Sequence, residues 1–226
     1  MRILAVDHGP NVRSELFGEV IRGEGHELVE WELPTKGVPQ EDGFDAVLVF
    51  GGRMNVGEEA EHPWLNDEYE LLRDWVAEEK PLLGVCLGAQ TLAHATGGKV
   101  GRAQQWHAGF YDVALTSEGE ADPIVGVLPE RFEALLANAY EFEPGPSATR
   151  LAATSNQQQA FRVGKRAWGV QFHPEARKEQ ALKWWSDGRK LDRPLPVLSA
   201  ELDEKLSAWH ELGRKLCLAF LREAAA

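Results

Sequence analysis

The sequence is poor in the residues that build disulfide-stapled, fibrous or disordered proteins. It holds 2 cysteines, 12 prolines and 22 glycines in 226 residues. Two cysteines, Cys86 and Cys217, cannot make a disulfide framework, and they indicate a reducing compartment or at most one bridge. Hydrophobic residues make up 43% and charged residues 27% of the chain, which excludes disorder and collagen-like order. A chain of this length is expected to form one domain, or one domain with an extension.

Basic residues and long apolar segments are also scarce. The chain has 24 Lys and Arg against 36 Asp and Glu, a net charge of −12, so we expect no nucleic-acid or membrane partner. The longest uncharged run, residues 81–98, has the length of a membrane span. It contains Pro81, Gln90 and several glycines, and it is interpreted as a buried strand, a sharp turn and a helix. The N-terminus has too short an apolar stretch for a secretory signal, and we predict a cytoplasmic protein.

Motifs for nucleotides and metals are missing as well. Neither a G-x-G-x-x-G sequence nor a P-loop is present. The remaining histidines show no paired ligand spacing such as H-x-x-x-H and are interpreted as structural; they are His8, His26, His62, His94, His107 and His210. We therefore expect no cofactor and no metal.

Apolar strands alternate with helical patterns in the first hundred residues. Strands are expected at residues 2–6, 26–33, 46–50 and 82–86, and helices at 11–22, 66–80 and 87–96. This alternation predicts an α/β fold with an open, doubly wound, mostly parallel sheet flanked by helices.

The remainder of the chain is richer in strand patterns and ends in helices. Strands are expected at residues 111–116, 150–154, 159–163 and 167–172, a short helix at 129–137, and tail helices at 176–185 and 200–223, with a connector at 187–196. No linker is long enough to split the chain. We predict a domain over 1–177 and a helical C-terminal extension over 178–226, packed on the same domain.

Cys86 is the first candidate for chemistry. It lies in Gly84-Val85-Cys86-Leu87-Gly88-Ala89-Gln90, where an apolar strand ends and a helix begins. A nucleophile in such a turn needs small neighbours, and the helix start favours a thiolate and offers the Leu87 N–H to an oxyanion. The alternative interpretation is a small buried cysteine beside glycines that permit packing.

His173 is the second candidate, in Gln171-Phe172-His173-Pro174-Glu175. Pro174 stops the strand ladder, so His173 is expected to project from the strand end. Strand ends of a doubly wound sheet line one crevice, where His173 can meet Cys86 and Glu175 can fix the imidazole tautomer. An isolated histidine would more often be structural, but its pairing with a cysteine elbow favours a catalytic role.

The third candidate is the glycine pair Gly51-Gly52, which follows the strongest apolar strand. It lets the backbone approach a ligand closely, and the Gly52 N–H could be a second oxyanion donor. A plain turn is the alternative interpretation.

Together these motifs resemble the class I glutamine amidotransferases over about residues 2–177, most closely stand-alone members similar to the glutaminase domain of GMP synthase. The resemblance implies a flavodoxin-like, class I glutamine amidotransferase-like fold. It also implies that Cys86 is the nucleophile, His173 the general base and acid, and Glu175 its orienting group. Gly52 and Leu87 would supply the oxyanion hole, and Gln90, Gly51 and Gly88 would contact a glutamine or γ-glutamyl substrate.

The chain departs from the family pattern in two places. Arg53 stands where many relatives carry Pro, and Asn138-Ala139-Tyr140 stands where many carry His-Gly-Asp. The second departure concerns the substrate and the mode of activation rather than the triad. The extension lies outside the resemblance, and a packed helical tail is favoured over a subunit-docking helix.

Four functions are compatible with these residues. The favoured one is a glutamine amidotransferase that passes ammonia to a separate synthase subunit, because the chain shows no ammonia-consuming domain. A γ-glutamyl amide or peptide hydrolase would use the same triad and thioester. A non-catalytic interaction module would not need all of Cys86, His173 and Glu175, and a redox-sensing or chaperone-like relative would not need the histidine motif. The sequence does not determine the oligomeric state.

Overall fold

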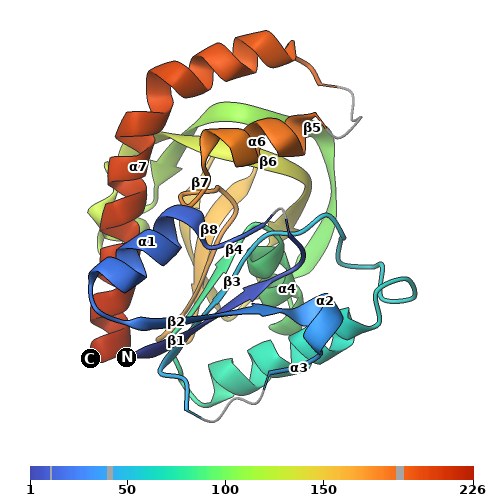
Figure 1. The fold of residues 1–226 in the computed structure, drawn as a ribbon, viewed down its shortest axis with the longest axis vertical. Coiled ribbons are helices and arrows are strands. Elements are labelled where there is room, and N and C mark those ends of the chain that lie inside the picture. Colours follow the sequence, from blue (N-terminus) through green and yellow to red (C-terminus); the bar gives the residue numbers. More distant parts are fainter. Residues whose placement is uncertain (11, 40–42, 187–190) are drawn as a thin grey trace.

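The computed structural model describes residues 1–10, 12–39, 43–186 and 191–226, and it places helices around one sheet (Figure 1). The strands are β1 (Arg2–Asp7), β2 (Glu27–Glu32), β3 (Ala46–Val49), β4 (Leu82–Val85), β5 (Lys99–Leu115), β6 (Arg131–Glu143), β7 (Ala148–Ala153), β8 (Gln158–Val163) and β9 (Ala167–Val170). The helices are α1 (Glu15–Gly23), α2 (Leu33–Lys36), α3 (Trp64–Ala77), α4 (Leu87–Ala95), α5 (Ser117–Glu120), α6 (Lys178–Trp185) and α7 (Leu195–Ala225), with a 3₁₀ turn, η1 (Val125–Val127). The strand order is β2-β1-β3-β4-β9-β8-β7-β5-β6.

The first half of the sheet, from β2 to β9 in this order, is parallel. Successive residues of β1 point to opposite faces. Ile3 and Ala5 belong to the core shared with α1 and α7, whereas Leu4 and Val6 belong to the core shared with α3 and α4. Strands covered on both faces carry uninterrupted apolar runs, as predicted for this part of the chain. The α/β fold with a doubly wound sheet between helices is thereby confirmed.

The second half of the sheet is antiparallel, and it corrects one prediction. Residues 129–137 do not form a helix, because the chain from Arg131 onward is β6. Phe132 and Ala134 are buried while the residues on either side of Phe132 are exposed, the period of two that a strand requires. Pairing with β5 and packing of Phe132 against Phe172 override the helix propensity of this Ala- and Leu-rich stretch.

The C-terminal helix α7 packs against α1, α6 and the strands β5 and β6 (Figure 1). Trp209 on α7 is 2% exposed. A Cβ atom on Gly213 would lie 2.3 Å from the carbonyl oxygen of Pro174, so a glycine is needed for α7 to pass this close. The boundary between a domain at 1–177 and an extension at 178–226 stays a prediction.

Several element ends differ from the predicted ones. α1 begins at Glu15 rather than residue 11, and Asn11 lies outside the described residues. α7 begins at Leu195, five residues before the predicted start, because Pro196 is accommodated in a first helical turn. Of the predicted connector, residues 187–190 lie outside the described residues. Within the described parts of the chain, no helix combines the length and apolar character that crossing a membrane requires.

Candidate active site

The candidate residues meet at the carboxyl ends of four neighbouring parallel strands. His8 follows β1, Gly51 lies just beyond β3, Cys86 follows β4, and His173 lies beyond the end of β9. The chain leaves β1 for β2 on one side and returns to β3 on the other side. A crevice outside the strand ends at such a reversal is where open α/β sheets bind ligands.

Cys86 occupies the sharp turn between β4 and α4. Its backbone has φ 54° and ψ −105°, and a positive φ is uncommon for a residue with a Cβ atom. A Cβ on Gly84 would lie 2.4 Å from the Gly88 carbonyl oxygen, and a Cβ on Gly88 would lie 2.0 Å from the Val49 carbonyl oxygen. The Cys86 N–H donates to the Val170 carbonyl oxygen at 2.8 Å. The turn therefore requires both glycines and is tied to β9.

His173 and Glu175 form a buried pair beside this turn. Nδ1 of His173 lies 2.8 Å from Oε1 of Glu175, and the two side chains are 3% and 0% exposed. The His173 backbone is held on both sides, because its N–H donates to the Leu135 carbonyl oxygen at 2.9 Å and its own carbonyl accepts from Trp209 Nε1 at 2.9 Å. With Nδ1 engaged by the carboxylate, Nε2 is the ring nitrogen left for other chemistry.

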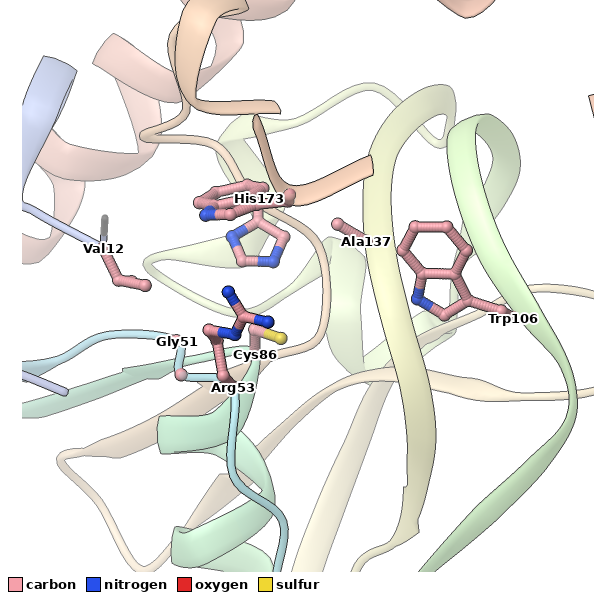
Figure 2. Close-up of a pocket in the computed structure, with 9 residues that line it drawn as sticks. Val12, Gly51, Arg53, Cys86, Trp106, Ala137 and His173 are labelled. Atoms are coloured by element: carbon pink, nitrogen blue, oxygen red, sulfur yellow. The ribbon is translucent and has the colours of Figure 1, made fainter. Parts of the chain in front are cut away.

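Cys86 and His173 adjoin one another. A Cβ on Gly51 would lie 3.2 Å from His173 Cε1 and 3.6 Å from Cys86 Cβ, and both side chains line one cavity with Arg53 (Figure 2). Burial alone would lower the pKa of His173, but the Glu175 carboxylate and the Cys86 sulfur outweigh it and raise that pKa to about 10. A sulfur thus lies next to an imidazole that holds a proton strongly.

Gly52 and Leu87 both line a cavity with Cys86, and each offers a backbone N–H. Leu87 is the first residue of α4, so its N–H has no acceptor within the helix. Gly52 lines the cavity with Cys86, and a Cβ on Gly52 would lie 2.5 Å from Leu87 Cδ2. Among the hydrogen bonds that join described residues, none uses the N–H of Gly52 or Leu87. Paired donors of this kind can stabilise an anion that develops near the sulfur.

A second cavity on the other side of Cys86 is lined by Gln90 and by the segment 138–140. Gln90 Nε2 donates to the Tyr140 carbonyl oxygen at 3.0 Å and to Gln171 Oε1 at 3.1 Å. Both of its N–H groups are used, so its amide oxygen is what Gln90 can offer a ligand. Gly88 lines neither cavity, and its N–H donates to the Phe50 carbonyl oxygen at 3.2 Å.

Two tryptophans that sequence reasoning did not place at the site line the Cys86 cavity. Trp184 packs against His173 with 4.4 Å between ring centroids and 43° between ring planes, and Trp106 lies in the irregular stretch of β5. The next residue on α6, Trp185, is 1% exposed and belongs to the core instead. Adjacent residues of a helix point in different directions, so the sequence could have indicated that only one of the two tryptophans lies in the core.

A second buried histidine–glutamate pair contacts the backbone of Gly51. His8 Nε2 is 2.6 Å from Glu68 Oε2, and His8 Nδ1 is 2.8 Å from the Gly51 carbonyl oxygen. Sequence analysis missed this pair because its members are 60 residues apart and share no motif. No group of three or more histidine, cysteine or acidic side chains among the described residues has the arrangement of a metal site.

Comparison with known proteins agrees with this geometry. A profile of the family described as glutamine amidotransferase class-I matches residues 5–185. One subunit of the glutamine-hydrolyzing GMP synthase of Natronomonas pharaonis is 29% identical over 184 residues, which cover 80% of this chain and 91% of that protein. The GMP synthase subunit of the same name from Ignicoccus hospitalis is 32% identical over 180 residues, which cover 77% of this chain and 89% of that protein.

Solved structures show the same fold. A glutamine amidotransferase from Thermotoga maritima superposes with a TM-score of 0.86 and 25% identity, covering 97% of both chains. A glutamine amidotransferase from Methylobacillus flagellatus superposes with a TM-score of 0.85 over 98% of this chain and 94% of that chain, at 18% identity. The Thermotoga coverage includes most of the C-terminal helices.

Proposed function

The chain belongs to the class I glutamine amidotransferase family, and we propose that it releases ammonia from glutamine with a Cys86–His173–Glu175 triad. The observation that carries the proposal is the placement of Cys86 in a strained elbow beside His173, whose Nδ1 is engaged by buried Glu175. An amide is a poor electrophile, so its cleavage needs an activated nucleophile and stabilisation of the tetrahedral anion. The site offers both.

In the first half-reaction, the Cys86 sulfur attacks the side-chain amide carbon of glutamine as a thiolate, because its proton is already held by His173 Nε2, whose pKa is raised to about 10. The oxygen of the tetrahedral intermediate accepts hydrogen bonds from the N–H groups of Gly52 and Leu87. The carbon–nitrogen bond then breaks, and His173 returns the proton to the departing ammonia. The product on the enzyme is a γ-glutamyl thioester.

In the second half-reaction, water attacks the thioester carbon and gives its proton to His173. Collapse of the second tetrahedral intermediate breaks the carbon–sulfur bond, and the Cys86 thiolate is regenerated beside protonated His173 as glutamate leaves. Glu175 stays ionised throughout and keeps Nδ1 protonated. The amide oxygen of Gln90 is available at the cavity where the amino-acid end of the substrate would lie. Gly51 lines the neighbouring cavity with Cys86 and His173.

A panel of γ-glutamyl compounds tests the substrate. Purified protein is expected to release ammonia from glutamine with a higher kcat/KM than it releases amines from γ-glutamyl alkylamides or dipeptides. A preference for the substituted amides would reassign the chain to the γ-glutamyl hydrolases with the same triad. Failure to cleave any of these compounds, with Cys86 also unreactive toward glutamine-like electrophiles, would overturn the proposed function.

We further propose that the ammonia is used on a separate synthase chain. The relatives from Natronomonas pharaonis and Ignicoccus hospitalis are each named as one subunit of a glutamine-hydrolyzing GMP synthase, and this chain spans nearly all of their length. Cross-linking in the source cell followed by mass spectrometry would identify an ammonia-consuming synthase as the partner. Recovery of this chain cross-linked only to itself would contradict a separate synthase.

A further inference from the structure

We propose that His8 and Glu68 form a positioning pair that orients the Gly51–Gly52 peptide so that the Gly52 N–H points toward Cys86. The inference rests on the proposed function and names the device that sets one of its two oxyanion donors. Neither residue touches the substrate. Their effect passes through a single peptide group.

The contacts that define the pair are short and fully buried. His8 Nδ1 lies 2.8 Å from the Gly51 carbonyl oxygen, His8 Nε2 lies 2.6 Å from Glu68 Oε2, and both side chains are 0% exposed. Trp64, one helical turn before Glu68 on α3, stacks on the imidazole with 5.3 Å between centroids and 18° between planes. α3 therefore holds the ring in place through two of its residues.

Peptide geometry carries this restraint to the active site. The bond between Gly51 and Gly52 is trans, so the carbonyl of Gly51 and the N–H of Gly52 belong to one plane and point in opposite directions. Because the Gly51 carbonyl accepts a hydrogen bond from His8, the Gly52 N–H must point away from His8. Gly51 lies beside Cys86 and His173, and Gly52 lines the cavities on both sides of Cys86. A pair of glycines has little conformational restraint of its own, so an outside contact must select this orientation.

The hydrogen bonds also determine which nitrogen carries a proton. A carbonyl oxygen only accepts, so Nδ1 of His8 must be protonated to bind Gly51. Nε2 shares a further proton with the Glu68 carboxylate. Burial on its own lowers the pKa of His8, but the charge and hydrogen bond of Glu68, the Gly51 carbonyl and the nearby Asp7 together raise it. The pair therefore keeps its donor toward Gly51 over a wide pH range.

Substituting His8 with asparagine or glutamine can distinguish the role of Nδ1 from the role of Nε2, because the two amide side chains differ in length. The side-chain nitrogen of asparagine occupies about the place of Nδ1, whereas that of glutamine occupies about the place of Nε2. We would compare His8→Asn with His8→Gln, each combined with Glu68→Gln so that no buried carboxylate loses its partner. Glu68→Gln alone serves as the reference, because its amide can donate to an unprotonated Nε2 while Nδ1 keeps its proton.

The positioning role predicts a selective loss of turnover. With glutamine, H8Q/E68Q should lose kcat by on the order of 10²- to 10³-fold relative to E68Q, the usual effect of losing one oxyanion donor. H8N/E68Q should stay within about tenfold of E68Q, and KM should change less than kcat in both. Alkylation of Cys86 by iodoacetamide, which forms no oxyanion, should proceed at similar rates in all variants.

A labelling measurement makes the test independent of turnover and of folding yield. A glutamine-like chloromethyl ketone also passes through a tetrahedral oxyanion on Cys86, so its rate relative to iodoacetamide should fall in H8Q/E68Q and recover in H8N/E68Q. Tyr69→Phe is the matched control, since Tyr69 adjoins Glu68 on α3 but binds Glu59 at 2.7 Å. That control should keep both rates.

Two results would overturn the inference. One is an equal kcat in the Asn and Gln variants, and the other is a fall in iodoacetamide reactivity as large as the fall in turnover, which would indicate a displaced cysteine. Full glutamine turnover by Cys86→Ala would instead refute the proposed function itself. The two failures are therefore distinguishable.

Discussion

Two buried histidine–glutamate pairs lie on either side of Gly51, and they differ in what the second ring nitrogen meets. In the His173–Glu175 pair, Nδ1 faces the carboxylate at 2.8 Å, and Nε2 has no nitrogen or oxygen partner among the described residues. In the His8–Glu68 pair, both ring nitrogens are engaged, one by the carboxylate and one by the Gly51 carbonyl. The same two residue types thus give one ring whose Nε2 has no nitrogen or oxygen partner among the described residues and one ring with both nitrogens engaged.

The two pairs also respond differently to their surroundings. The pKa of His173 is raised in part by the Cys86 sulfur, whereas the pKa of His8 is raised by Glu68, Gly51 and Asp7, which do not take part in the proposed reaction. A substitution at the reacting sulfur should therefore affect one pair alone. This difference can be tested by breaking each pair in turn.

The largest effect is expected from removing the sulfur or its base. Cys86→Ala and His173→Ala should each lower kcat by on the order of 10⁶-fold, because members of a catalytic unit are lost together. Measuring ammonia release under saturating glutamine, with circular dichroism as the check on folding, tests this. Wild-type-like turnover in either folded variant would remove that residue from the triad.

Replacing the glutamate of each histidine–glutamate pair with glutamine compares the two pairs directly. Glu175→Gln should cost on the order of 10⁴-fold in kcat, less than His173→Ala, because the orienting group is the less costly member of such a unit. Glu68→Gln should cost less than about tenfold, because an amide can still keep Nδ1 of His8 protonated. Steady-state kinetics on both variants measure the difference, and equal losses would mean that the pairs have the same role.

Trp209 offers a smaller test of how the reactive pair is held. Trp209→Phe keeps a ring against Phe132 and Phe172 but removes the hydrogen bond to the His173 carbonyl. Leaving that carbonyl without a partner should lower the free energy of unfolding by about 1–3 kcal/mol. Urea denaturation measures this cost. A stability equal to that of the wild-type protein would show that α7 does not hold His173 in place.

The pH dependence of stability gives the finest comparison. The pKa of His173 is raised from 6.5 to about 10 in the folded protein, so its contribution to stability is complete below pH 6.5 and is lost as the pH rises toward 10. Cys86→Ala removes one of the groups that raise this pKa, so the loss should still begin near pH 6.5 but be complete at a lower pH in that variant. Titration of the imidazole ¹⁵N resonances should show His173 shifting and His8 unchanged. A shift of both would mean that the two rings are coupled.

The contact between His173 and Glu175 could be predicted from sequence because the two residues are close in the chain. Glu175 follows His173 by two residues, and the glycines around Cys86 indicate a tight turn on their own. The chain order of apolar strands also predicted the parallel half of the sheet, since burial on both faces leaves a clear pattern.

The features that sequence analysis missed depend on contacts between distant segments. His8 and Glu68 come together only because α3 covers the face of the sheet on which the end of β1 lies, and each alone is an ordinary residue. Residues 129–137 have the composition of a helix, and only pairing with β5 makes them part of a strand. Trp184 differs from Trp185 by its direction on α6, which becomes informative once the position of His173 is known.

The proposed reaction requires that Cys86 carry a γ-glutamyl group during turnover. The Glu175→Gln variant, in which hydrolysis should be slowed, can be mixed with glutamine, quenched with acid and digested for peptide mass spectrometry. We predict a γ-glutamyl adduct on the peptide that contains Cys86, labile to hydroxylamine and absent from the peptide that contains Cys217. Glutamate production without any adduct on Cys86 at any time point, or an adduct on another residue, would refute the thioester mechanism.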